Sequence, residues 1–328
     1  MEFWLPVIFA AVMGLALLLY VILDGYDLGV GLLLPLADES EKDAMVASIG
    51  PFWDANETWI VLGVGVLLIA FPAAHGIVLT TLYLPATLML MGLVLRGVAF
   101  DFRIKAGADQ KQRWNRLFTL GSLLASLCQG WMLGRFVTGL LPSGLGWSFA
   151  LLTALALPTL YLMLGACWLY TRTTAALSLK ARRWARRLWL PLGLALLVIA
   201  LATPLVSERI ADKWFSFGNL PLVMPVPMLT LAAYSLLGME LWTPGVRRPL
   251  RAFLLVTVLC LLSAVGLAYS LYPDIILGQL TLFEAAAAVE SLRFALWGVL
   301  ATVPLILAYT VFVYRIFSGP QTIAHYES

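Results

Sequence analysis

The sequence predicts an all-α polytopic membrane protein, because of its composition and the length of its apolar segments. Of its 328 residues, 62% are hydrophobic and 12% are charged, and the mean hydropathy is +0.93. Soluble globular chains are about half apolar and roughly a quarter charged. Hydrophobic runs of about 20 residues, long enough to cross a hydrocarbon core of about 30 Å, recur along the chain. Backbone groups in lipid must be satisfied within each segment, so these runs are expected to be helices.

We expect about nine transmembrane helices in a single integral membrane domain over residues 1–328, arranged as two four-helix bundles plus one peripheral helix. The expected ranges are 6–34, 57–73, 76–99, 117–138, 147–171, 187–206, 221–242, 250–272 and 292–316. The first range has no basic region before it and no small-residue cleavage pattern, so we interpret it as a retained helix and not as a signal peptide.

The orientation follows from the Lys and Arg residues of the connections, because cytoplasmic loops carry an excess of both. Basic connections alternate with uncharged, balanced or acidic ones; the basic ones are 103–116, 172–187 and 244–251, and the others are 139–146, 207–214 and 273–291. With nine helices, the N-terminus is expected outside and the C-terminus in the cytoplasm. The 35–56 connection is then also cytoplasmic, although it is net acidic.

Composition also argues against several functions. The net charge of +3 is small, so nucleic-acid binding is not expected. Cys128, Cys167 and Cys260 are isolated in apolar segments and are interpreted as buried small hydrophobes. His75 and His325 are the two histidines, and neither has a partner at haem-ligand spacing. We therefore expect no metal site and no haem ligated by this chain, and no cofactor-binding residue is identified.

Asp24 and Asp27 interrupt the first apolar run, in the stretch Leu23–Gly31. They are three residues apart, so both are expected on one face of a helix. An ionisable side chain at membrane depth is costly and is a functional hypothesis by default. The alternative is that the helix ends near Leu23 and leaves both carboxylates among the headgroups. The apolar Leu28–Leu36 favours the first interpretation.

A second motif, Trp53-Asp54-Ala55-Asn56-Glu57-Thr58-Trp59, directly precedes the next apolar run. Asp54 and Glu57 fall in the opening turn of a helix, where the helix dipole favours negative charge. We interpret them as carboxylates on a proton path, with Asn56 in their hydrogen-bond network and Trp53 beside them. The alternative is an N-cap with an aromatic belt. The orientation brings this motif and the first pair of aspartates together near the cytoplasmic face, and burial of a carboxyl group lets it exchange a proton near neutral pH.

A third stretch, Leu95–Arg103, ends the third expected helix at the same face. Arg96 is placed to offset a buried carboxylate, and Asp101 is expected to pair with Arg103. Snorkelling of both arginines to the headgroups explains the pattern equally well. Glu240 is a further carboxylate near the inner end of the seventh helix.

The chain resembles subunit II of the cytochrome bd-type quinol oxidases, including the cyanide-insensitive branch. The resemblance rests on three blocks, Asp24–Gly31, Trp53–Trp59 and Arg96–Arg103, and on weaker similarity in Ser291–Phe294 and Pro304–Thr310. The chain departs from the family at Tyr26, Ala55 and Asp101, where the family often has Phe, Gly and Glu. Residues 139–290 match by hydropathy more than by motif.

The resemblance implies a complex in the bacterial cytoplasmic membrane that oxidises quinol and reduces dioxygen to water. Subunit I would hold two b-type haems, haem d and the quinol-oxidation site. Subunit II would stabilise that haem-bearing partner and conduct cytoplasmic protons. Asp54 corresponds to the proton-relay carboxylate, with Asp24, Asp27 and Glu57 supporting it. The family also includes members with a quinone bound in subunit II as a structural lipid, and small single-helix accessory subunits are further expected partners.

Two other functions fit the same residues. A proton-coupled secondary transporter also uses intramembrane carboxylates and glycine-interrupted helices. A purely structural assembly subunit would use the carboxylates only to orient its helices.

Overall fold

The computed structural model describes residues 3–173, 175–243, 245 and 248–317. Within these ranges, nine helices are long and apolar enough to cross a membrane. They are α1 (Trp4–Leu33), α3 (Trp53–Ala70), α4 (Pro72–Lys105), α5 (Ala108–Val137), α6 (Gly144–Arg172), α7 (Ala175–Val206), α10 (Pro225–Trp242), α11 (Pro249–Leu271) and α13 (Val289–Ile316). The predicted all-α membrane architecture is confirmed by these helices.

The connections contain shorter elements that the hydropathy pattern did not indicate. They are η1 (Leu34–Leu36), α2 (Glu39–Ile49), α8 (Glu208–Phe215), α9 (Leu220–Val223), the two-stranded hairpin of β1 (Asp274–Ile276) and β2 (Leu280–Thr281), and α12 (Leu282–Ala285). Several long helices also extend past their apolar run. For example, α5 begins at Ala108 instead of near 117, because the polar residues before the apolar run continue its hydrogen-bonded turns.

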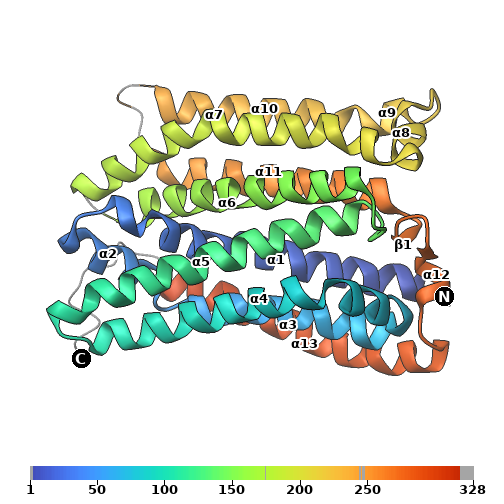
Figure 1. Cartoon of the computed structure of the whole chain (residues 1–328), viewed down its shortest axis with the longest axis horizontal. Coiled ribbons are helices and arrows are strands. Elements are labelled where there is room, and N and C mark those ends of the chain that lie inside the picture. The colour runs from blue at the N-terminus through green and yellow to red at the C-terminus, as the bar shows by residue number, and fades with distance from the viewer. Residues whose placement is uncertain (1–2, 174, 244, 246–247, 318–328) are drawn as a thin grey trace.

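The long helices run side by side along the long axis of the molecule (Figure 1). Helix α1 lies centrally and packs against α3, α5 and α6, and α4 packs along α5. Helix α6 also contacts α7 and α11, and α10 contacts both of these helices. Helix α13 lies at the edge of the molecule, where it packs against α3 and α1.

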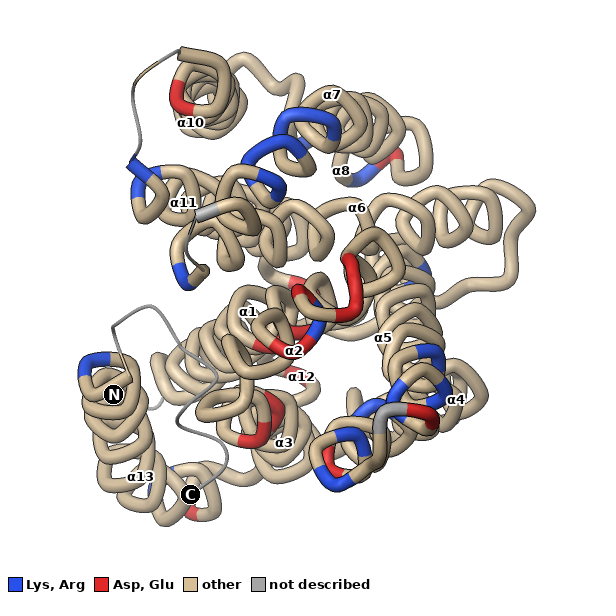
Figure 2. The backbone as a smooth tube through the Cα atoms, turned by 90° about the vertical axis from the view of Figure 1, so that its left-hand side faces the viewer, with Lys and Arg blue, Asp and Glu red and all other residues tan. Residues whose placement is uncertain are grey.

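The acidic connection after α1 folds as α2 and pairs with basic residues of other helices. Asp43 is 2.8 Å from Arg103 and 3.2 Å from Lys111, at the turn between α4 and α5. Glu41 is 2.5 Å from Lys180 of α7. Positions of acidic and basic residues gather at this end of the molecule, on α2, α4, α5 and α7 (Figure 2). The acidic composition of the connection is therefore explained by neutralisation of the basic helix ends around it.

Helices α1 and α6 cross in close contact at two glycines, Gly29 and Gly165. A Cβ added at Gly29 would lie 1.8 Å from the carbonyl oxygen of Tyr161, and one added at Gly165 would lie 2.5 Å from the carbonyl carbon of Gly29. Small residues allow helix backbones to approach closely in membranes. This crossing places the α1 carboxylates against α6.

We predict that Gly29→Ala lowers the free energy of unfolding by at least about 1–3 kcal/mol, because backbone atoms of α6 fill the space of the new methyl group. The melting temperature of the purified protein measures the effect. Gly14→Ala is the matched control in the same helix, since a Cβ there meets nothing within 4 Å. Equal melting temperatures for the two variants would contradict the close crossing.

Candidate functional site

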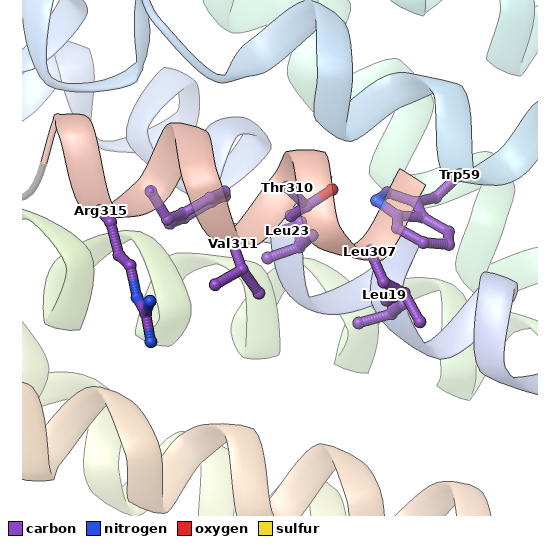
Figure 3. Close-up of a pocket in the computed structure, with 8 residues that line it drawn as sticks. Leu19, Leu23, Trp59, Leu307, Thr310, Val311 and Arg315 are labelled. Atoms are coloured by element: carbon purple, nitrogen blue, oxygen red, sulfur yellow. The ribbon is translucent and has the colours of Figure 1, made fainter. Parts of the chain in front are cut away.

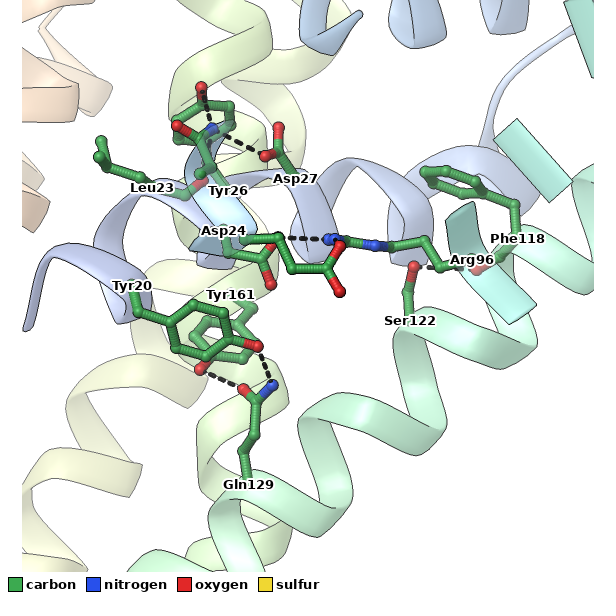
Figure 4. Close-up of polar contacts among 12 residues, drawn as sticks. Tyr20, Leu23, Asp24, Tyr26, Asp27, Arg96, Phe118, Ser122, Gln129 and Tyr161 are labelled. Carbon is green, nitrogen blue, oxygen red and sulfur yellow. Dashed lines mark hydrogen bonds and ion pairs between the residues drawn. The ribbon is translucent and has the colours of Figure 1, made fainter. Parts of the chain in front are cut away.

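The guanidinium of Arg96 joins three helices at the centre of the site (Figure 4). Arg96, on α4, is 1% exposed. Its Nη1 donates to Oδ1 of Asp24 on α1 at 2.5 Å, and its Nη2 donates to Oε2 of Glu57 on α3 at 2.8 Å. Asp24 is fully buried, whereas the Glu57 side chain is 27% exposed. Arg96 therefore neutralises a buried carboxylate, as one of the two interpretations of this residue predicted, and does not snorkel to the headgroups.

Asp24 and Asp27 lie well inside α1. Asp24 lies nine positions before Leu33, the last residue of α1. This distance is about 14 Å along the helix axis. Both side chains are fully buried. The alternative in which the helix ends near Leu23 is therefore wrong, because the apolar residues after Asp27 continue the same helix.

Asn56 forms hydrogen bonds with Asp27 and with a tyrosine of α13. Its Nδ2 donates to Oδ2 of Asp27 at 2.8 Å and to the hydroxyl of Tyr26 at 2.8 Å. The Tyr314 hydroxyl of α13 donates to Oδ1 of Asn56 at 3.0 Å and lies 2.5 Å from the Tyr26 hydroxyl. Oδ1 of Asp27 and Oδ2 of Asp24 have no hydrogen-bond partner among the described residues.

A second polar group, which the sequence did not indicate, lies beside the carboxylates. Gln129 of α5 donates from Nε2 to the Tyr20 hydroxyl at 2.6 Å, and the Tyr161 hydroxyl donates to its Oε1 at 2.6 Å. Tyr20 comes from α1 and Tyr161 from α6, and Figure 4 shows both rings next to Asp24. Uncharged polar residues in apolar segments give no distinctive sequence signal, so this group is visible only once the helices pack.

Asp54 lies at the edge of the site and not within it. It is exposed, in the first turn of α3, and makes no hydrogen bond or ion pair with another described residue. Trp53 is partly buried and its ring packs 5.1 Å from that of Phe100. The structure thus brings Asp24, Asp27, Asn56 and Glu57 together and leaves Asp54 on the outer surface one helical turn away.

The expected pair between Asp101 and Arg103 is wrong. Arg103 is buried and lies 2.8 Å from Asp43 of α2, and its Nε donates to the side-chain oxygen of Asn115. Asp101 is exposed. The reason is the fold of α2, which presents a carboxylate to Arg103 from a distant part of the sequence.

An apolar groove of about 410 Å³ reaches the site from the side of α13 (Figure 3). Its lining comes from α1, α3 and α13 and consists of Leu19, Leu23, Trp59, Leu307, Thr310, Val311, Tyr314 and Arg315. Tyr314 belongs to both features, because its ring lines the groove and its hydroxyl contacts Asn56.

Side chains that commonly ligate metal ions are dispersed over the described residues. Within those residues no group of three or more His, Cys, Asp or Glu side chains is placed to hold a metal ion. His75 lies in the first turn of α4, whereas His325 falls outside the described residues. No chemical step is therefore assigned to a metal or haem held by this chain.

Comparison with known proteins identifies the family. The sequence matches the family described as "Cytochrome bd terminal oxidase subunit II" over residues 5–317. This chain belongs to that family. It is 26% identical to "Cytochrome bd-I ubiquinol oxidase subunit 2" of Escherichia coli K12, with 92% of this chain and 91% of the relative aligned. It is 25% identical to "Cytochrome bd ubiquinol oxidase subunit 2" of Bacillus subtilis 168, with 93% of each chain aligned.

The fold has a solved counterpart. A chain of the bd oxidase from Geobacillus thermodenitrificans superposes with a TM-score of 0.77 at 21% sequence identity, covering 95% of this chain and 98% of that one. The resemblance stated from the sequence blocks is confirmed. The protein is a multi-pass membrane subunit of a quinol:oxygen oxidoreductase complex that contains haem and a subunit I.

We predict that Arg96→Leu lowers the free energy of unfolding by about 3–5 kcal/mol, because it leaves the buried Asp24 carboxylate without its cation. Thermal unfolding of the purified complex measures this loss. Adding Asp24→Leu to the same variant should restore part of the stability. Lys105→Ala, which removes an exposed cation from the same helix, should have almost no effect. A similar small effect for Arg96→Leu would contradict the buried pair.

We predict that Tyr314→Phe lowers the free energy of unfolding by about 1 kcal/mol, because the hydroxyl that bonds Asn56 and Tyr26 is lost while the ring remains. Hydrogen exchange of α13, measured by mass spectrometry, should then rise in its C-terminal half. Tyr309→Phe is the control on the same helix, since Tyr309 is 58% exposed. If both variants exchange at the wild-type rate, Tyr314 does not anchor α13.

Proposed function

We propose that this chain supports the haem-bearing subunit I and contributes to the uptake of cytoplasmic protons for the reduction of oxygen to water. The carboxylate cluster around Arg96 carries the proposal. Asp24, Asp27 and Glu57 surround a single guanidinium that contacts two of them. The three carboxylates outnumber the one guanidinium by two negative charges, so each proton that the cluster takes up reduces an uncompensated buried charge, which is costly.

The proposed route begins at Asp54. Its exposed carboxylate lies three residues before Glu57, so the two residues share a face of α3. Glu57 is partly exposed and bonds Arg96, and so connects the surface with the buried carboxylates. Asp24 and Asp27, each with one oxygen free of hydrogen bonds, would accept the proton or order the network.

Asn56 and Trp53 support this route without carrying the proton. Asn56 donates to Asp27 and thereby fixes the direction of its carboxylate. Trp53 packs against Phe100 of α4 and against Gly97, which keeps the start of α3 close to α4. This packing holds Glu57 within reach of Arg96.

We further propose that the α3 surface around Asp54 faces subunit I. A carboxylate directed at lipid is costly, and a protein surface beside Asp54 would remove that cost. The quinol-oxidation site, two b-type haems and haem d are assigned to subunit I from the family resemblance. The same resemblance supports a structural quinone and single-helix accessory subunits, to which no residue of this chain is assigned.

The proposed topology keeps the N-terminus outside and the C-terminus in the cytoplasm of a bacterium. The support is the gathering of Lys and Arg at the end of the molecule that holds α2 (Figure 2).

Two four-helix groups are also proposed. Helix contacts connect α1, α3, α4 and α5 in one ring and α6, α7, α10 and α11 in another, with α13 beside the first.

A purely structural role is the competing function that one observation supports. The pair between Arg96 and Asp24 joins α1 to α4, so a purely structural role explains these two residues as well. It does not explain Asp54, which is exposed and bonds no other described residue. A proton-coupled transporter is disfavoured by membership in the oxidase subunit family.

We predict that Asp54→Asn in the intact complex lowers quinol oxidase activity by about tenfold or more with unchanged haem content, because loss of a proton-transfer carboxylate slows the coupled chemistry. Oxygen consumption and the haem absorbance spectrum are the two measurements. Asp101→Asn is the control, as it removes another exposed carboxylate near the same membrane face. Full activity in Asp54→Asn would exclude the relay role, and loss of haem would favour a structural one.

A further inference from the structure

A small polar pocket lies between α10 and α11, at the basic end of the molecule and separate from the carboxylate cluster. Its volume is about 180 Å³, and it is lined by Leu236, Met239, Glu240, Thr243, Arg248 and Arg251. Figure 2 shows the acidic position of α10 and the basic start of α11 at this end. The pocket therefore offers both signs of charge at the level where a helix end meets the membrane surface.

Glu240 is buried but incompletely paired. It is 4% exposed, and its Oε1 has no hydrogen-bond partner among the described residues. Its Oε2 lies 3.7 Å from Nη1 of Arg251, which is longer than a hydrogen bond. A buried carboxylate with a free oxygen in a pocket has the capacity to accept a hydrogen bond from a cationic group.

The pocket arginines are also available, unlike their neighbours on α7. Arg182 donates to the carbonyl oxygens of Glu240, Leu241 and Thr243, and Arg186 donates to that of Leu241. These bonds cap the end of α10 and hold both side chains against its carbonyl oxygens. Among the described residues, the one ion pair of Arg251 is its long contact with Glu240, and Arg248 is exposed at the start of α11.

We propose that this pocket binds the headgroup of a zwitterionic aminophospholipid such as phosphatidylethanolamine. The phosphate would lie against Arg248 and Arg251, because guanidinium groups bind phosphate oxygens through paired N–H donors. The ammonium would donate to Glu240, which an anionic lipid without an amine would leave unsatisfied. Leu236 and Met239 are 39% and 64% exposed and provide an apolar path for an acyl chain below the headgroup. A basic pocket between membrane helices is a recurrent form of lipid headgroup site.

The test is native mass spectrometry of the delipidated oxidase complex after addition of defined lipids. Phosphatidylethanolamine should be retained about tenfold more than phosphatidylglycerol by the wild type, as expected for one charge-assisted hydrogen bond. Arg248→Ala with Arg251→Ala should reduce retention of phosphatidylethanolamine by about tenfold or more. Glu240→Gln should retain both lipids equally. Arg113→Ala, which removes an exposed cation of α5 outside the pocket, should retain lipid as the wild type does.

The experiment includes two controls, one for binding of the free headgroup and one for assembly of the complex. Soluble glycerophosphoethanolamine at the same concentration should not be retained, and equal retention would overturn the lipid assignment. The haem spectrum of each variant reports assembly, and Arg251→Lys provides a milder substitution if the double variant does not assemble. Wild-type retention in the double variant, or in Arg251→Lys where the double variant does not assemble, would overturn the proposal, because lysine lacks the paired N–H donors of arginine. Equal retention of the two lipids by the wild type would also overturn it. None of these residues belongs to the proposed proton route, so the result is independent of it.

Discussion

The ion pair between Arg96 and Asp24 is the interaction on which the rest of the site depends. Both side chains are almost completely buried, so neither charge is solvated by water. Such a pair contributes little stability compared with an apolar contact, but loss of one partner leaves a charge that the surroundings do not compensate. Its second bond, to Glu57, extends the constraint to α3. The positions of α1, α3 and α4 are thereby fixed relative to each other.

The residues packed around the buried ion pair hold it in an apolar environment. Close crossing of α1 and α6 at Gly29 and Gly165 leaves no room for a side chain between the two backbones. On another side, the ring of Tyr26 stacks 4.0 Å from that of Trp168, and Trp168 in turn lies under the guanidinium of Arg172. The low dielectric that results strengthens each hydrogen bond of the network and makes each unpaired oxygen costly. The free oxygens of Asp24 and Asp27 are therefore the features that a packing role alone explains least.

Much of this site was predictable from sequence, for a specific reason. Asp24, Asp27 and Arg96 are charged residues in apolar runs, and Asp54 and Glu57 directly precede one, so each stands out without knowledge of the fold. The packing partners do not stand out. Tyr314 reaches Asn56 from a helix more than 250 positions later in the chain, and Gln129 with Tyr20 and Tyr161 carries no charge that would distinguish it from ordinary polar residues of membrane helices. Asp101 is the wrong partner for Arg103, because the helical fold of the 39–49 segment, which brings Asp43 to Arg103, is not visible in its hydropathy.

The central claim is that the buried cluster serves proton uptake and does more than orient helices. Proton uptake during an oxygen pulse tests it most directly, measured with a pH-sensitive dye outside proteoliposomes that expose the cytoplasmic face of the reduced complex. In Glu57→Gln, which keeps a hydrogen-bonding side chain beside Arg96, we expect normal haem content and slower proton uptake than in the wild type. Proton uptake at the wild-type rate in this variant and in Asp54→Asn would contradict the account.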